Sequence, residues 1–160
     1  MTHTITTRLA TPADAEQALD VVRQSITVLC AVDHQHDEPT LERWLRNKTP
    51  EYFNRWCVDP DNRLVVAVLD SAIAGVALLR RSGEIHLCYV RPDCARAGVG
   101  HALLLALEVY AREWNIATLT LSSTFSARFF YERHGFVAAG DSLPHYGLLR
   151  GYPYTKALSG

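Results

Sequence analysis

The segment from residue 84 to residue 114, EIHLCYVRPDCARAGVGHALLLALEVYAREW, constrains the fold of this chain most strongly. A strand-like run ends at Val90, a loop follows, and Gly98 and Gly100 lead directly into a long helical pattern. The N–H groups in the first turn of a helix have no partner inside the helix, and the helix dipole is positive there. Glycines at this place let a ligand approach the backbone closely. The segment therefore predicts a phosphate or diphosphate site at a helix N-terminus.

Two well-known nucleotide-binding loops also place glycines before a helix, and neither matches this segment. A P-loop requires a lysine followed by Ser or Thr, and GVGHAL has neither. A dinucleotide-binding fingerprint requires glycines directly at the strand end and a third glycine near position 103, which is Leu103. Taken alone, the segment is also compatible with an ordinary loop–helix junction.

The composition limits the class of protein. With 160 residues, of which 48% are hydrophobic, the chain is expected to form one domain, residues 1–160. Its formal net charge of −1 gives no electrostatic reason to expect nucleic acid or an anionic membrane as a partner. The apolar runs are too short to span a bilayer, and the first residues lack a signal-peptide pattern. The four cysteines have no CxxC spacing, so we expect a reduced cytoplasmic protein without a structural zinc site.

Hydrophobic periodicity predicts an α/β chain with the element order β-ααα-β-β-β-α-β-α-β-β. Thr11 and Pro12 mark the start of the first helix, which should continue to about Cys30. Residues 31–38, AVDHQHDE, carry no periodicity and are expected to form a loop. The expected strands are residues 4–9, 63–70, 72–80, 84–90, 117–123, 136–140 and 146–158. Hairpins connect the middle strands and helices connect the later ones, which predicts a mixed sheet with helices on both faces.

Two motifs in this order resemble those of the GNAT superfamily of N-acetyltransferases. The first, YVRPDCARAGVGHALL, is similar to the acetyl-CoA loop of that family, Gln/Arg-x-x-Gly-x-Gly/Ala after a strand. The second, SARFFYERHGF, is similar to the family pattern A-x-x-F-Y-E-K/R-x-G-F. The second motif is matched at Ala127, Phe130, Tyr131, Glu132, Arg133, Gly135 and Phe136. The resemblance implies the GNAT acyl-CoA N-acyltransferase fold, acetyl-CoA as cosubstrate, and transfer of an acetyl group to a primary amine.

The resemblance also implies which residues contact the cosubstrate. The diphosphate is expected on the N–H groups from Arg96 to His101, and the pantetheine arm beside strand residues 87–90. The N–H groups near Cys88 would polarise the thioester carbonyl, as an oxyanion hole does. The Gln/Arg position of the family falls on Ala95, and an asparagine frequent in the family is replaced by Thr124. The expected cofactor-binding residues are Cys88, Tyr89, Val90, Ala95, Arg96, Ala97, Gly98, Val99, Gly100, His101, Thr124 and Ala127.

The resemblance makes Tyr131 the expected acid, whose hydroxyl protonates the departing thiolate; the alternative is an aromatic residue of the core. Strand alternation places Glu84 and His86 on one face together with Cys88 and Val90, with Ile85, Leu87 and Tyr89 on the other. Glu84 and His86 are therefore the candidate general bases, and the choice between them stays open. Glu84 could instead be an exposed residue at the start of a strand, and His86 a hydrogen-bonded core histidine.

The acceptor is expected between the first helices, the central strands and the last hairpin. Acidic residues there would attract a cationic amine, although a solvated loop would account for the same charges more simply. The expected substrate-binding residues are Asp33, His34, Asp37, Glu38 and Trp44. The favoured acceptor is a small-molecule amine such as an aminoglycoside-type antibiotic or a polyamine. A peptide N-terminus and a non-catalytic acyl-CoA sensor are the alternatives; relatives also suggest a homodimer, and no metal is expected.

Overall fold

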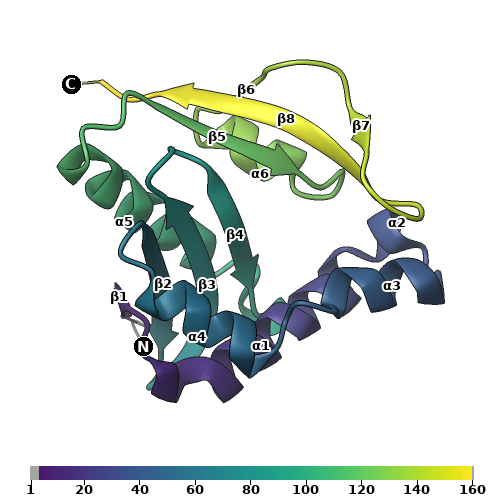
Figure 1. The fold of residues 1–160 in the computed structure, drawn as a ribbon, viewed down its shortest axis with the longest axis horizontal. Helices are drawn as coiled ribbons and strands as arrows, with labels where there is room; N and C mark the ends of the chain where they lie inside the picture. Colours follow the sequence, from purple (N-terminus) through teal and green to yellow (C-terminus); the bar gives the residue numbers. More distant parts are fainter. Residues whose placement is uncertain (1–3, 160) are drawn as a thin grey trace.

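The computed structural model describes residues 4–159, which fold into two antiparallel sheets with helices packed around them (Figure 1). The first sheet has the strand order β1-β2-β3-β4. Its strands are β1 (Ile5–Leu9), β2 (Asn62–Leu69), β3 (Ala72–Arg80) and β4 (Ile85–Val90). In the second sheet, β8 (Arg150–Ala157) pairs with β5 (Thr118–Ser123), β6 (Val137–Ala138) and β7 (Leu143–Pro144).

The two sheets meet at one end through an isolated parallel bridge between Glu84 and Thr120. Beyond this bridge β4 and β5 diverge, and Figure 1 shows them pointing in different directions. The α/β class and the GNAT-type element order are confirmed. The mixed sheet predicted from the sequence is, however, divided in two, because pairing between β4 and β5 stops after the bridge.

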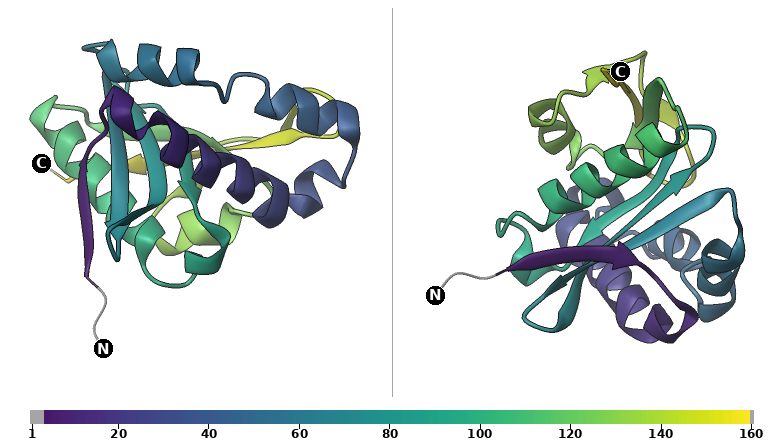
Figure 2. Two further views of the ribbon diagram at one scale, coloured as in Figure 1. Left: turned by 90° about the horizontal axis from the view of Figure 1, so that it is seen from below. Right: turned by 90° about the vertical axis from the view of Figure 1, so that its left-hand side faces the viewer.

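Helices α1 (Ala15–Gln24) and α4 (Pro50–Val58) cover one face of the first sheet (Figure 2). Helix α3 (Glu38–Leu45) lies beyond the sheet and joins the same hydrophobic cluster through Trp44. A 3-10 turn (Pro12–Asp14) precedes α1, and Thr11 and Asp14 form a capping box there. A π-helical turn (Ser25–Leu29) extends α1 nearly to Cys30, close to the predicted end of this helix. Residues 31–38 are not all loop, because α2 (Ala31–His34) forms a single short turn of helix.

Helix α5 (Val99–Glu113) covers the opposite face of the first sheet, and α6 (Arg128–Arg133) packs near the second sheet. A short 3-10 turn (Pro92–Cys94) lies between β4 and α5. Buried side chains therefore form two hydrophobic clusters, one on each face of the first sheet. The cluster on the α5 side continues to β5, α6 and β8, and it fixes the second sheet against the first. None of the helices formed by residues 4–159 is long and apolar enough to cross a membrane.

Candidate active site

A cavity of about 690 Å³ opens where β4 and β5 diverge. Strand β4 and the glycine loop form one wall; β5, the turn after it and α6 form the other. The lining residues are Ser25, Leu29, Cys30, Ile85, His86, Cys88, Tyr89, Val90, Ala95, Arg96, Gly98, Gly100, His101, Leu121, Ser122, Thr124, Ser126, Ala127, Phe130, Tyr131, Arg133 and His134. Most of the predicted cofactor-binding residues therefore surround one cavity. Of that set, Ala97 and Val99 do not line it.

The glycine loop has the geometry that the sequence predicts for an anion site. Gly98 precedes α5 with φ of 90°, in the left-handed region that favours glycine. The first hydrogen bond of the helix runs from the Ala102 N–H to the Gly98 carbonyl, at 3.0 Å. The N–H groups before Ala102 therefore have no partners inside the helix. A Cβ atom on Gly100 would lie 2.8 Å from the Phe130 ring, so this position has no room for a side chain. Val99 points the other way and is buried in the core.

Two histidines that sequence reasoning did not pair lie at this end of the cavity. His134 Nδ1 lies 2.8 Å from the Phe130 carbonyl, and His134 Nε2 lies 3.0 Å from His101 Nδ1. Because the carbonyl only accepts, His134 donates to it from Nδ1, and its Nε2 is directed at His101. Arg96 and Arg133 also line this region, where the family position for Gln or Arg is occupied by Ala95.

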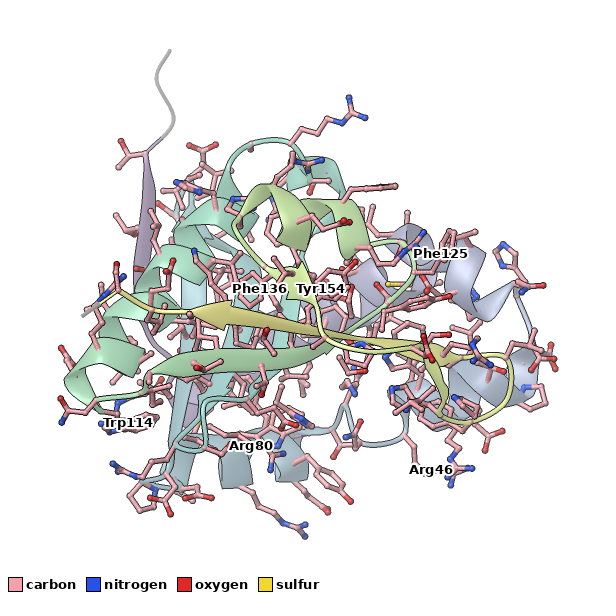
Figure 3. All side chains as sticks on the ribbon, turned by 90° about the horizontal axis from the view of Figure 1, so that it is seen from above. Arg46, Arg80, Trp114, Phe125, Phe136 and Tyr154 are labelled. Carbon is pink, nitrogen blue, oxygen red and sulfur yellow. The ribbon has the colours of Figure 1, made fainter. Side chains whose placement is uncertain are left out.

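Tyr131 lies on α6, is buried, and lines the cavity beside Cys88. Burial, and then the neighbouring Cys88, raises the pKa of Tyr131 well above its ordinary value. Burial likewise raises the pKa of the Cys88 thiol to about 12. Both groups are therefore protonated near neutral pH, and the Tyr131 hydroxyl is available as a proton donor. Figure 3 shows Phe136 next to Tyr154 near α6, and both belong to the cluster that buries Tyr131.

A β-bulge at His86 changes the alternation expected along β4. Leu78 pairs with Leu87, whereas the next residue, Leu79, pairs with Ile85, so His86 has no residue opposite it. As a result, Ile85 and Leu87 belong to clusters on opposite faces of the sheet. The prediction that Ile85 and Leu87 share a face is therefore wrong, because the extra residue, His86, reverses the alternation between them.

Glu84 and His86 lie close together at the bulge. His86 Nδ1 is 3.6 Å from Glu84 Oε1, which also lies 3.3 Å from Arg80 Nε. The Trp56 ring of α4 packs edge-on against His86, with 6.3 Å between ring centroids. Burial and the positive charge of Arg80 lower the pKa of His86, against an opposing effect of Glu84. His86 lines the cavity, whereas the half-exposed Glu84 side chain does not.

The residues predicted to bind the acceptor do not form an acidic pocket. Asp33 is 6% exposed, and its carboxylate accepts from Phe125 N–H at 2.7 Å and from the Ser126 hydroxyl at 2.6 Å. His34 is fully buried; its Nε2 donates to carbonyls of the π-helical turn and its Nδ1 accepts from the His36 N–H. These side chains hold α2 and the turn after β5 in place, which explains why a segment without periodicity is helical.

The remaining three residues of the predicted acceptor set are also separate from one another. Asp37 caps α3 by accepting from the Thr40 N–H at 3.2 Å and from its hydroxyl at 2.6 Å. Glu38 is exposed in the first turn of α3. Trp44 is buried, and its Nε1 donates to the Tyr89 hydroxyl at 3.1 Å. Trp44 thereby contacts β4 through Tyr89 and does not line the cavity.

Further cavity residues were missed at the sequence level. The π-helical turn contributes Ser25 and Leu29, and the strand β5 and its following turn contribute Ser122 and Ser126. The strand pattern could have indicated Ser122, because it follows the apolar Leu121 in the last residues of a predicted strand. The other three carry no recognisable signal. Among residues 4–159, no three His, Cys, Asp or Glu side chains are arranged to hold a metal ion.

The divided sheet, the glycine loop on α5 and the buried tyrosine define an acyltransferase-type site, and comparison with known families agrees. The acetyltransferase (GNAT) domain model matches residues 30–158. This chain belongs to the GNAT acetyltransferase family. A comparison with curated protein sequences finds no match.

Solved structures of similar fold include members of the same family. A GCN5-related N-acetyltransferase from Rhodopseudomonas palustris is 26% identical, with a TM-score of 0.85 and coverage of 97% of this chain and 96% of that one. The PaiA N-acetyltransferase from Thermoplasma acidophilum, solved with coenzyme A, is 21% identical, with a TM-score of 0.82 and coverage of 97% and 99%. A streptothricin acetyltransferase from Bacillus anthracis, solved with acetyl coenzyme A, is 23% identical, with a TM-score of 0.61 and coverage of 67% and 68%.

Proposed function

We propose that this protein is an N-acetyltransferase that uses acetyl-CoA to acetylate a primary amine of a small molecule. The observation that carries the proposal is the buried, protonated Tyr131 in the same cavity as the free N–H groups of the glycine loop. Solved relatives of the same fold were crystallised with coenzyme A or acetyl coenzyme A. The residues present fit that cosubstrate, since the cavity joins an anion site to a proton donor.

Each wall of the cavity has a distinct role in this proposal. Acetyl-CoA, when bound, supplies an acetyl group activated as a thioester. The N–H groups of Arg96 and of residues 98–101 hold its diphosphate, whereas the Ala97 N–H already donates to the Cys94 carbonyl at 3.1 Å. Thr124 and Ala127 contact its pantetheine arm. Backbone N–H groups of β4 near Cys88 polarise the carbonyl. The Tyr131 hydroxyl donates a proton to the sulfur as the C–S bond breaks. Fixing both reactants in one cavity avoids the entropic cost of their meeting in solution.

Two β4-side groups are the candidate bases for the amine proton. His86 is held neutral near pH 7 by its lowered pKa, so it can accept a proton. Glu84 is in contact with both His86 and Arg80, and it would act through His86 or through water.

The acceptor is proposed to enter on the α4 side of β4, where aromatic side chains gather. Trp56 contacts His86, and Tyr52 contacts Trp56 with 6.3 Å between ring centroids. Aromatic side chains beside His86 suit a compact organic amine, and an aminoglycoside-type antibiotic or a polyamine is the specific class proposed. The Bacillus anthracis relative is named for a small-molecule antibiotic, streptothricin, which favours this class over a peptide.

The proposal is tested by a thiol-release assay with acetyl-CoA and a panel of acceptors. Turnover with aminoglycosides, polyamines or amino acids is expected. Turnover confined to peptides would favour protein acetylation. Calorimetric binding of coenzyme A without turnover on any acceptor would favour an acyl-CoA sensor. Absence of both coenzyme A binding and turnover in folded protein would refute the proposal. Light scattering of the same sample tests whether the protein is a homodimer, as its relatives suggest.

A further inference from the structure

A serine–histidine pair outside the predicted cosubstrate-binding set is formed at the β5 wall of the cavity, where Ser122 lines the cavity and His145 lies behind it. Ser122 lines the cavity, and its hydroxyl is 3.1 Å from His145 Nε2. In β5 the buried Leu121 packs in the α5-side cluster, so the exposed Ser122 projects from the opposite face. Across the cavity, His86 of β4 belongs to the same lining, and Trp56 of α4 packs against His86. Ser122 therefore shares the cavity with His86, beside which the acceptor is proposed to enter.

The turn that contains His145 is fixed to α3. Leu149 N–H donates to the Tyr146 carbonyl at 2.9 Å, and His145 N–H donates to the Leu149 carbonyl at 2.9 Å. Leu148 N–H donates at 3.0 Å to the Thr40 hydroxyl, which itself donates to Asp37. His145 is consequently held by a closed turn with an external anchor, although its own side chain is exposed.

The backbone beneath the pair is glycine, and the geometry requires it. A Cβ atom on Gly151 would overlap both His145 Nε2 and Ser122 Oγ. Any larger residue at this position would therefore separate the two side chains. An exposed neutral hydrogen bond contributes only about 1 kcal/mol to stability, so stability alone gives little reason for this arrangement.

The pair is better placed than the β4 groups to remove a proton from the acceptor. Glu84 is engaged by Arg80 at 3.3 Å and lies outside the cavity lining. The positive charges of Arg80 and Lys48 disfavour protonation of the His86 ring. His145 can release a proton to solvent, because this residue is exposed. On α3, Arg43 stacks on Tyr146, the neighbour of His145, with the Arg43 Cζ 4.9 Å from the Tyr146 ring centroid.

We infer that Ser122 and His145 form a proton relay that serves the amine acceptor; this inference rests on the proposed function. As the acceptor nitrogen forms its bond to the acetyl carbon, its surplus proton passes to Ser122 Oγ. The Ser122 hydroxyl proton passes at the same time to His145 Nε2, which releases it to water. The C–S bond breaks, and the sulfur takes the Tyr131 proton, which water restores. Ser122 contacts the substrate, and His145 acts through Ser122.

The test compares Ser122→Ala, His145→Gln and the double variant in acetyl transfer to the best amine of the acceptor panel. The glutamine retains a hydrogen-bonding side chain but cannot take up a proton at that site. Each single variant is expected to lower kcat by about 10²-fold, the lower end of the range for acid–base groups. The double variant should lose no more than either single variant, because the two residues act as one unit. Coenzyme A affinity, measured by calorimetry, should stay unchanged in all three.

Added imidazole should restore turnover to His145→Ala, an effect that a purely structural role would not produce. His36→Ala, which removes another exposed histidine away from the cavity, is the matched control and should retain wild-type kcat. Unchanged kcat in His145→Gln, additive losses in the double variant, or failure of imidazole to restore His145→Ala would each overturn the relay. Those outcomes leave the proposed function intact. If the wild-type protein neither binds coenzyme A nor catalyses acetyl transfer, both the relay and the proposed function are wrong.

Discussion

Replacing Asp33 by alanine should destabilise the protein through the turn that carries Thr124 and Ala127. The Asp33 carboxylate is 6% exposed and accepts two hydrogen bonds, from Phe125 N–H at 2.7 Å and from Ser126 Oγ at 2.6 Å. Hydrogen bonds to charged groups contribute about 1.5–3 kcal/mol each. Removing the carboxylate also removes the cost of burying its charge. We therefore expect the lower end of this range for both bonds, a loss of about 3 kcal/mol in the free energy of unfolding. For a chain of this size that loss corresponds to a fall in Tm of roughly 6–12 °C.

Thermal unfolding followed by circular dichroism measures this effect, with Asp61→Ala as the control. Asp61 forms an ion pair with Arg81 at 2.7 Å, but its side chain is 67% exposed, so its removal should cost at most about 1 kcal/mol. Coenzyme A affinity should fall in Asp33→Ala, because Thr124 and Ala127 belong to the released turn. If Asp33 instead attracts the acceptor amine, Tm will stay within a degree of the wild type while the KM for the amine rises. That result would refute the structural role assigned to this carboxylate.

Four further changes test other parts of the site. Tyr131→Phe should lower kcat by ~10²-fold with coenzyme A affinity unchanged in calorimetry; an unaltered kcat would remove Tyr131 from the mechanism. Gly100→Ala places a Cβ atom 2.8 Å from the Phe130 ring, so calorimetry should show weaker coenzyme A binding, and wild-type affinity would contradict the tight packing. The pKa of Lys48 is lowered by burial from 10.5 to about 8. The unfolded chain therefore binds more protons between these pH values, and folding stability should rise with pH across them. Scanning fluorimetry should accordingly show the Tm of the wild type increasing relative to that of Lys48→Met from pH 8 to pH 10. A difference in Tm that does not change with pH would argue against a lowered pKa at Lys48. His86 has a pKa lowered below 6.5 by burial. If His86 is a base, kcat/KM should rise with pH to a plateau before pH 7, and His86→Ala should lose that limb; an identical profile would exclude it.

Most residues predicted to contact the cosubstrate lie where the sequence places them, around one cavity. Glycines before a helix and the motif around Tyr131 specify local geometry, and local geometry depends on neighbouring residues in the chain. Most of the predicted cofactor-binding residues consequently line a single cavity. The acceptor set was predicted from charge, and charge does not report which carboxylates find internal partners. Asp33 and Asp37 are both engaged by donors that only the folded chain brings near them.

The alternation along β4 shows a second limit of the sequence. Period-two patterning assumes an unbroken ladder, and nothing in EIHLCYV marks the extra residue at His86. The bulge depends on how β4 pairs with β3, which is a property of two strands rather than one.

The sequence by itself determined the family, the order of the elements, the glycine loop and the tyrosine on α6, because each of these follows from residues adjacent along the chain. Only the tertiary structure decided that the sheet divides after Glu84, that Asp33 and His34 are structural, and that Ser122 meets His145 above Gly151. Those contacts join segments far apart in the chain, and their energies come from burial and hydrogen bonds that exist only once the two sheets have packed together.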